Sequence, residues 1–180
     1  MAHQIKSGIT VQSGPRHVLK RPALAALLGS IAAEWGSLED RITFFYAYLM
    51  GRYLPRTPGF SPPIHPVALQ VFDVLETLRK RLELIESLGA WVIKNDALVQ
   101  ELRDTVMPAI LRASKLRNEY LHAHWGVADE YPDALILLPI FGNNMACEES
   151  DFNEAINRII AATDIVGKFE VKVREFLDGK

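Results

Sequence analysis

The segment LRNEYLHAHWG, residues 116 to 126, brings together a guanidinium, an amide and an imidazole, those of Arg117, Asn118 and His122. An imidazole exchanges protons near neutral pH, and a guanidinium can bind two phosphate oxygens at once. Together they suit cleavage of RNA without a metal ion. The imidazole would remove the proton of a 2′-hydroxyl, and the guanidinium would stabilise the charge on the phosphorane. The nucleophile then belongs to the substrate, so a 2′,3′-cyclic phosphate is the expected product and no cofactor is needed.

These three residues stand near the end of a helix that we expect to begin at Asn95 or Asp96 and to end before Gly126. Asn118 and His122 are four residues apart, so they share one face of it. A different face should meet the core, because it carries the apolar residues Leu102, Val106, Ala109, Ala113, Leu116 and Tyr120. A helix with two such faces often has a second partner, which here could be another copy of the chain.

Apolar residues at spacings of three and four predict three further helices. One begins at Pro22 and continues to about Gly51, and the next runs from about residue 67 to a stop at Gly89. The last is capped by Ser150 or Asp151. Five prolines make a loop of residues 52–66, and Pro108 should kink the helix that it interrupts.

The predicted fold is therefore all-α: an up-and-down bundle of four long helices, with a short β-hairpin between the third and last helices. The hairpin is predicted from HWGVA and from the apolar run ALILLPIFG at 134–142. Residues 1–20 mix Gly, Ser, Pro and basic residues without a period, which indicates a flexible N-terminal arm. Residues 21–180 would then form a single helical domain.

Composition narrows the function classes. The formal net charge of −2 excludes a global basic field, so any RNA contact must be local. Cys147 is the only cysteine, which excludes a disulfide within the chain and a zinc site of several thiolates. The N-terminus lacks the apolar core of a signal peptide, and no uncharged run reaches membrane-spanning length. We therefore expect a cytoplasmic protein that makes no membrane contact.

The Arg-Asn-x-x-x-His spacing of RNEYLH, the long helix before it and the His-x-Trp-Gly after it resemble HEPN-like domains. The resemblance covers about residues 22 to 178, although its motifs outside 117–122 are loose. It implies a helical bundle that dimerises so that the motifs of two chains face each other. In many members such a dimer is a metal-independent ribonuclease, in defence, stress or toxin–antitoxin settings, and an antitoxin or other regulatory protein is a possible partner.

Carried over to this chain, the resemblance makes Arg117 and His122 catalytic, with Asn118 orienting or assisting them. Glu39 or Asp40 on the first helix would contact the arginine, as acidic or polar residues do in some relatives. Lys115 is a further supporting candidate. It belongs to a local basic patch that could compensate for the acidic net charge if folding brings two helices together: Arg79, Lys80, Arg81, Arg112, Lys115 and Arg117.

Other interpretations of the same residues remain open. The domain could be a non-catalytic module that binds a nucleotide or a protein, or a scaffold in which the motif only holds a dimer together. Arg117 could simply pair with a carboxylate, while His122 lies exposed at the helix end. A metal site at His122 and His124 is disfavoured, because residues two apart on a helix point in nearly opposite directions. Trp35, Trp91 and Trp125 are more typical of a core than of base-stacking platforms, and Cys147 is more typical of an inert buried thiol.

Overall fold

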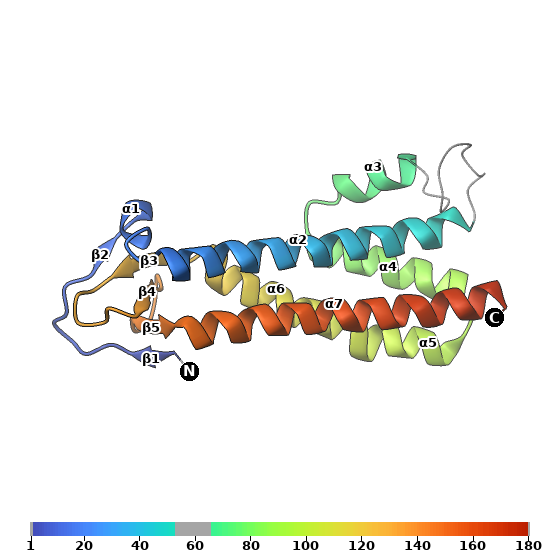
Figure 1. The fold of residues 1–180 in the computed structure, drawn as a ribbon. Coiled ribbons are helices and arrows are strands. Elements are labelled where there is room, and N and C mark those ends of the chain that lie inside the picture. Colours follow the sequence, from blue (N-terminus) through green and yellow to red (C-terminus); the bar gives the residue numbers. More distant parts are fainter. Residues whose placement is uncertain (1, 53–65, 180) are drawn as a thin grey trace. The chain divides into compact units, whose positions relative to one another are not determined.

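The structure is a computed structural model that describes residues 2–52 and 66–179. It is 70% helical and contains a small antiparallel sheet of five short strands (Figure 1). The helices are α1 Pro15–Val18, α2 Pro22–Gly51, α3 Pro66–Val74, α4 Leu78–Ile93, α5 Asp96–Glu101, the π-helical turn η1 Leu102–Val106, α6 Met107–Leu121 and α7 Glu149–Asp178. The strands are β1 His3–Gln4, β2 Gln12–Ser13, β3 His124–Val127, β4 Ala134–Leu138 and β5 Met145–Glu148.

The predominantly helical fold is confirmed, but its details differ from four helices and a hairpin. Contacts divide the chain into two compact units. The first, which we call the sheet unit, contains Met1–Gly36 and Arg112–Ala161; the second, the helical unit, contains Ser37–Leu111 and Ala162–Lys180. Helices α2, α6 and α7 contribute residues to both units. A single domain over 21–180 remains a prediction.

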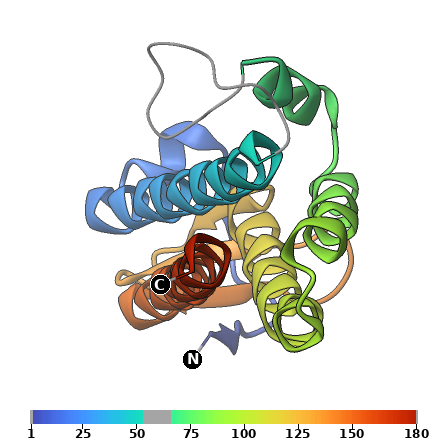
Figure 2. The ribbon, with the colours of Figure 1, turned by 90° about the vertical axis from the view of Figure 1, so that its right-hand side faces the viewer.

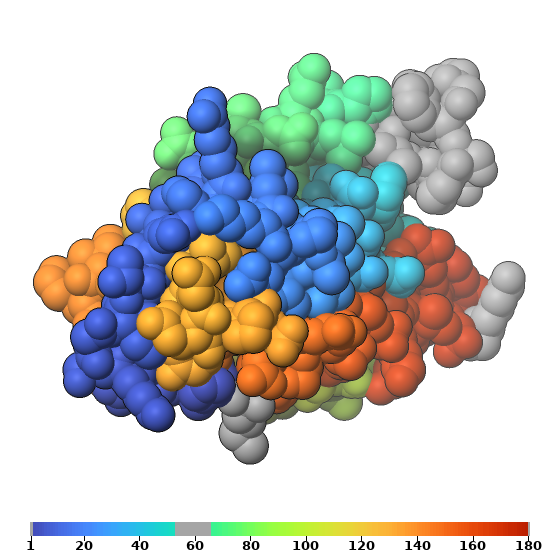
Figure 3. Space-filling model, turned by 60° about the vertical axis from the view of Figure 1, so that its left-hand side comes forward, coloured from blue at the N-terminus to red at the C-terminus, as the bar shows by residue number. Residues whose placement is uncertain are grey.

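The sheet has the strand order β1-β5-β4-β3-β2, and every pairing is antiparallel. The predicted β3–β4 hairpin is confirmed, with Trp125 opposite Leu137. The sequence did not predict the other strands, and two of them come from the N-terminal arm expected at 1–20. A two-stranded hairpin is only marginally stable alone, and the short outer strands enlarge it and cover its edges. Figure 3 shows the dark blue N-terminal residues lying against the ochre segment that contains β3.

Gly126 was predicted to end a helical pattern and to lie within the hairpin strand HWGVA, and it is a buried residue of β3. A Cβ atom built on it would lie 2.6 Å from Val11 Cγ1 and 2.9 Å from the carbonyl oxygen of Gln12. Only glycine therefore allows β2 to approach β3 this closely.

The second predicted helix is wrong as a single element, because residues 75–77 separate α3 from α4. The side chain of Thr77 caps α4 by accepting a hydrogen bond from the backbone N–H of Lys80 at 3.3 Å. Gly89 does not stop α4. It lies inside the helix, where a Cβ atom would come within 3.0 Å of Leu102 Cδ2, and α4 ends only before Lys94, which has a φ of 50°.

The cap predicted at Asn95 is confirmed, since its Oδ1 accepts a hydrogen bond from the N–H of Leu98 at 3.1 Å. The helix is irregular just before Pro108, where it forms the π-helical turn η1. At the end of this turn the N–H of Met107 donates to the carbonyl oxygen of Leu102. Proline cannot donate to the carbonyl four residues back and collides with it, and a wider turn accommodates both effects. The helix then ends at Leu121, before the last predicted residues.

The final helix starts at Glu149, slightly before the predicted caps. Asp151 lies in its first turn, and its carboxylate accepts a hydrogen bond from the N–H of Glu148 at 2.9 Å. The side chain thus reaches back to the residue before the helix, as the third helical residue does in a capping box.

Each unit has its own aromatic contacts. In the sheet unit Tyr120, Trp125 and Phe152 contact one another, with ring centroids 5.4 to 5.9 Å apart. In the helical unit Phe45 of α2 contacts Phe169 of α7, with ring centroids 5.6 Å apart. Figure 2 shows the cyan end of α2 beside the red end of α7. Among the described residues, no helix combines the length and apolar character needed to cross a membrane.

Candidate functional site

The RNEYLH motif lies in the sheet unit, where α6 ends and β3 begins. Arg117 and Asn118 belong to the last turns of α6, and His122 follows directly after it. The indole N–H of Trp125 donates to the carbonyl oxygen of Tyr120 at 2.8 Å. This bond satisfies a carbonyl at the helix end and holds the reversal that brings the chain into β3.

Arg117 contacts both of the other motif side chains, and we call the three residues the Arg–His cluster. Arg117 Nη1 donates to Asn118 Oδ1 at 2.8 Å and lies 3.1 Å from His122 Nε2. A guanidinium has donors but no acceptor, so the imidazole must accept at Nε2. In this arrangement His122 is neutral and carries its proton on Nδ1. Asn118 and His122 are exposed and Arg117 is half-buried, so the cluster is open to a large ligand.

A fourth side chain, which sequence reasoning treated as core, completes the cluster. The Cζ atom of Arg117 lies 5.1 Å from the ring centroid of Trp35 on α2, a cation–π distance. Trp35 is only 4% exposed. Arg117 Nε and Trp35 Nε1 are both buried without a hydrogen-bond partner among the described residues. No local spacing could have revealed this contact, because the two residues are far apart in the sequence.

The supporting residues are less closely connected. Lys115 is exposed, and its Nζ lies 3.9 Å from Glu119 Oε1 along the same helix. Glu39 and Asp40 lie on α2 in the helical unit, and their contact with Arg117 remains a prediction. Among the described residues of the sheet unit, no carboxylate forms an ion pair with Arg117.

The proposed basic patch draws residues from both units and also remains a prediction. Two of its arginines have partners in the helical unit. Arg79 Nε lies 3.0 Å from Glu83 Oε1, and Arg81 Nε donates to the carbonyl oxygen of Leu75 at 2.9 Å.

Two groups of the sheet unit have pKa values raised by burial. Burial raises the pKa of Tyr120, whose hydroxyl donates to the carbonyl oxygen of Asp151 at 3.2 Å. Burial also raises the pKa of the Cys147 thiol to about 12, with a smaller contribution from the charge of Asp151. A thiol that stays protonated near neutral pH is a poor nucleophile, which supports the interpretation of Cys147 as inert.

The chemistry open to the site is therefore that of a guanidinium and an imidazole. Across the described ranges 2–52 and 66–179, no three His, Cys, Asp or Glu side chains are grouped so as to hold a metal ion. A hollow of about 270 Å³ lies beside α6, lined in part by Leu116, Tyr120 and Asp151, and the Arg–His cluster does not line it. The chain was compared with family models, curated proteins and solved structures, and none of them matches it.

Proposed function

We propose that the chain is a metal-independent RNA endonuclease of the HEPN type that acts as a dimer. One observation carries the proposal: at an exposed helix end, the arginine and histidine of the motif contact each other directly, with Nη1 and Nε2 3.1 Å apart. A phosphodiester needs a cation and a proton acceptor side by side for this cleavage. The resemblance of RNEYLH to the HEPN motif supports the same reaction.

The contact between Arg117 and His122 suggests how the substrate would engage them. An entering phosphate is a stronger acceptor for the guanidinium than a neutral imidazole, so it would draw Nη1 away from Nε2. The freed Nε2 lone pair then takes the proton of the 2′-hydroxyl, whose oxygen attacks phosphorus. As the bond from phosphorus to the 5′-oxygen breaks, His122 of a second copy, which must be in its protonated imidazolium form for this step, gives that oxygen a proton. The products are a 2′,3′-cyclic phosphate and a 5′-hydroxyl.

A defence, stress or toxin–antitoxin setting, with a regulatory protein that restrains the enzyme, forms part of the same proposal. It rests on the resemblance alone.

A second candidate is a non-catalytic module that binds a nucleotide or protein at the same cluster. One observation favours it: among the described residues, no group accepts a hydrogen bond from Nδ1 of His122. A catalytic base is usually oriented by such an acceptor.

The test is incubation of purified protein with mixed RNAs in excess EDTA, followed by analysis of product ends. We compare the wild type with His122→Ala, and use His124→Ala as the matched control because it removes another exposed imidazole from the same segment. The proposal expects wild type and His124→Ala to leave 2′,3′-cyclic phosphates and His122→Ala to be inactive. If neither wild type nor variants cleave any of a broad set of RNAs, but wild type binds them, the binding module is the better account.

A further inference from the structure

We propose that Trp35 is a positioning residue for Arg117. Its indole ring holds the guanidinium in the orientation that directs Nη1 at His122. The effect expected on cleavage rests on the proposed function, whereas the effect expected on the geometry of the cluster does not.

An arginine side chain has many conformations open to it. A long side chain on the surface of a helix samples many rotamers, and ordering it has an entropic cost. Arg117 has three described contacts, and two of them, with Asn118 and His122, are made by exposed side chains. Trp35 is the exception, because it is 4% exposed and belongs to the long helix α2. The buried ring of Trp35 therefore provides a fixed surface on which the guanidinium of Arg117 packs.

The unpartnered Nε atom shows which part of the Arg117 guanidinium is buried. Arg117 Nε is buried and has no hydrogen-bond acceptor, while its Cζ lies 5.1 Å from the ring centroid of Trp35. A buried donor without an acceptor is unfavourable, and attraction of the cation to the ring offsets part of that penalty. The Nε edge is consequently covered, and the terminal Nη atoms are left to meet a ligand. A phosphate would then bind end-on to Arg117, beside His122.

Trp35 Nε1 is also buried without a described partner, so its N–H is not what holds Arg117. The ring face is the functional part of the side chain. This distinction separates two substitutions: Trp35→Phe keeps an aromatic face, whereas Trp35→Leu removes it. Phe45→Leu is the matched control, since Phe45 is a 2% exposed aromatic residue of the same helix whose ring contacts Phe169 in the helical unit.

The first experiment needs no activity. Nitrogen-15 chemical shifts of the imidazole report which ring nitrogen of His122 carries the proton, with His122→Ala used to assign the signal. We expect the Nδ1–H tautomer in the wild type, Trp35→Phe and Phe45→Leu. Trp35→Leu should shift His122 toward the Nε2–H tautomer that is favoured in water, while circular dichroism shows the fold retained. If folded Trp35→Leu keeps the wild-type tautomer, the positioning role is wrong; if that variant does not fold, the same test applies to Trp35→Phe, which must keep the Nδ1–H form.

The second experiment measures cleavage. Loss of orientation at a catalytic group costs about 100-fold in rate, so Trp35→Leu should lower kcat about 100-fold with little change in KM, and Trp35→Phe should stay within about five-fold of wild type. An equal loss in Phe45→Leu would mean that general destabilisation is responsible and would overturn the inference. A wild type that cleaves no RNA, but whose His122 tautomer responds to Trp35→Leu, would overturn the proposed function and leave the positioning role intact.

Discussion

Two arginines of this protein, one in each unit, make the same kind of cation–π contact with an aromatic ring. Arg117 lies over Trp35 with its Cζ 5.1 Å from the ring centroid, and Arg174 lies over Tyr48 at 4.8 Å. Both aromatic residues belong to α2. In both arginines the Nε atom is buried without a hydrogen-bond partner among the described residues. The packing of the two guanidinium groups against aromatic rings is therefore closely similar.

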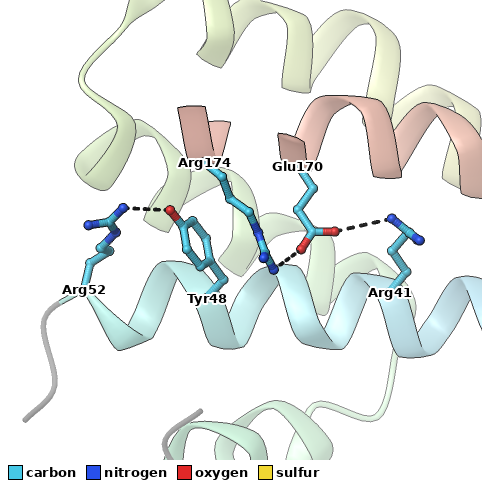
Figure 4. Close-up of polar contacts among 5 residues, drawn as sticks. All are labelled: Arg41, Tyr48, Arg52, Glu170 and Arg174. Atoms are coloured by element: carbon cyan, nitrogen blue, oxygen red, sulfur yellow. Dashed lines mark hydrogen bonds and ion pairs between the residues drawn. The ribbon is translucent and has the colours of Figure 1, made fainter. Parts of the chain in front are cut away.

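Their partners differ. Arg174 pairs with Glu170, whose side chain is 11% exposed, and the other oxygen of that carboxylate lies 3.5 Å from Arg41 Nη1 (Figure 4). In the same figure Arg52 donates to the hydroxyl of Tyr48 at 2.7 Å. Arg117 instead has the neutral partners Asn118 and His122.

The difference concerns charge rather than packing. When a buried carboxylate compensates the charge of a guanidinium, removing either partner destabilises the helix pair that they join. Such a guanidinium attracts a further anion only weakly. A guanidinium with only neutral partners keeps its attraction for an incoming phosphate. We therefore expect the arginine of the sheet unit to serve ligand binding and that of the helical unit to serve stability.

The largest expected effect comes from removing each arginine in turn. Arg117→Ala should lower the cleavage rate by about 100-fold to 1,000-fold, as loss of one preorganised donor to a developing charge does elsewhere. Its melting temperature should change little. Arg174→Ala should show the opposite behaviour, with normal cleavage and a lower melting temperature. Initial rates on one RNA and thermal unfolding of both variants make the comparison, and a melting loss in Arg117→Ala equal to that of Arg174→Ala would contradict it.

The next largest effect is expected from Glu170, the carboxylate that pairs with Arg174 and has no counterpart in the Arg–His cluster. Glu170→Gln leaves Arg41 and Arg174 without a countercharge. Breaking a buried pair costs about 3–5 kcal/mol, and because both arginines also reach solvent we expect a loss of about 2 kcal/mol in the free energy of unfolding. Urea denaturation measures it.

The matched control for that experiment is Glu83→Gln. Glu83 pairs with Arg79 on the surface of α4, where the two side chains are 58% and 85% exposed, and such pairs contribute less than about 1 kcal/mol. Equal losses in the two variants would show that burial of Glu170 has no special role.

Whether the sequence could predict a contact in either arginine cluster depends on how far apart the contacting residues are along the chain. The expectation that Asn118 and His122 lie near each other follows from their spacing of four, and the cap at Asn95 follows from its chemistry. Both are local. The contact of Trp35 with Arg117 joins two helices, and the apolar pattern of α2 distinguishes neither Trp35 nor Tyr48 from an ordinary core residue.

The parts of the fold that were missed have a similar cause. Strands β1 and β2 have only two residues each, too few for an alternating pattern, and the pairing of His3 with Ala146 spans nearly the whole chain. The break at Thr77 is different, because the signal was local: a threonine that caps a helix inside an apolar stripe. The prediction of a single helix followed the continuous apolar stripe and overlooked the capping threonine.

A smaller effect is expected when the neutral cluster is given a charge. In Asn118→Asp an oxygen that already lies 2.8 Å from Arg117 Nη1 becomes part of a carboxylate, so the cluster comes to resemble that of Arg174. Cleavage should fall about ten-fold or more, because the new carboxylate competes with the phosphate. The melting temperature should rise slightly, since exposed pairs contribute about 0.2–1 kcal/mol. Asn118→Ala, which removes the contact without adding charge, is the control; if it loses as much activity as Asn118→Asp, charge compensation is not the reason.

The smallest effect is a loss of stability at alkaline pH, which tests the burial of the sheet. The two arginines do not contribute to it, because guanidinium groups keep their charge throughout the alkaline range. Burial raises the pKa of Cys147 from 9.0 to about 12. The folded chain therefore keeps this proton between pH 9 and 12 while the unfolded chain loses it, so stability is full below pH 9 and falls as the pH rises. Between pH 8 and pH 10 the free energy of unfolding should drop by about 1 kcal/mol from this group. Urea denaturation at both pH values should show a smaller drop in Cys147→Ala, with a remainder from Tyr120, whose pKa burial also raises. An unchanged drop would mean that the thiol ionises as readily in the folded chain as in the unfolded one, and that strand β5 is more open to water than the 3% exposure of Cys147 indicates.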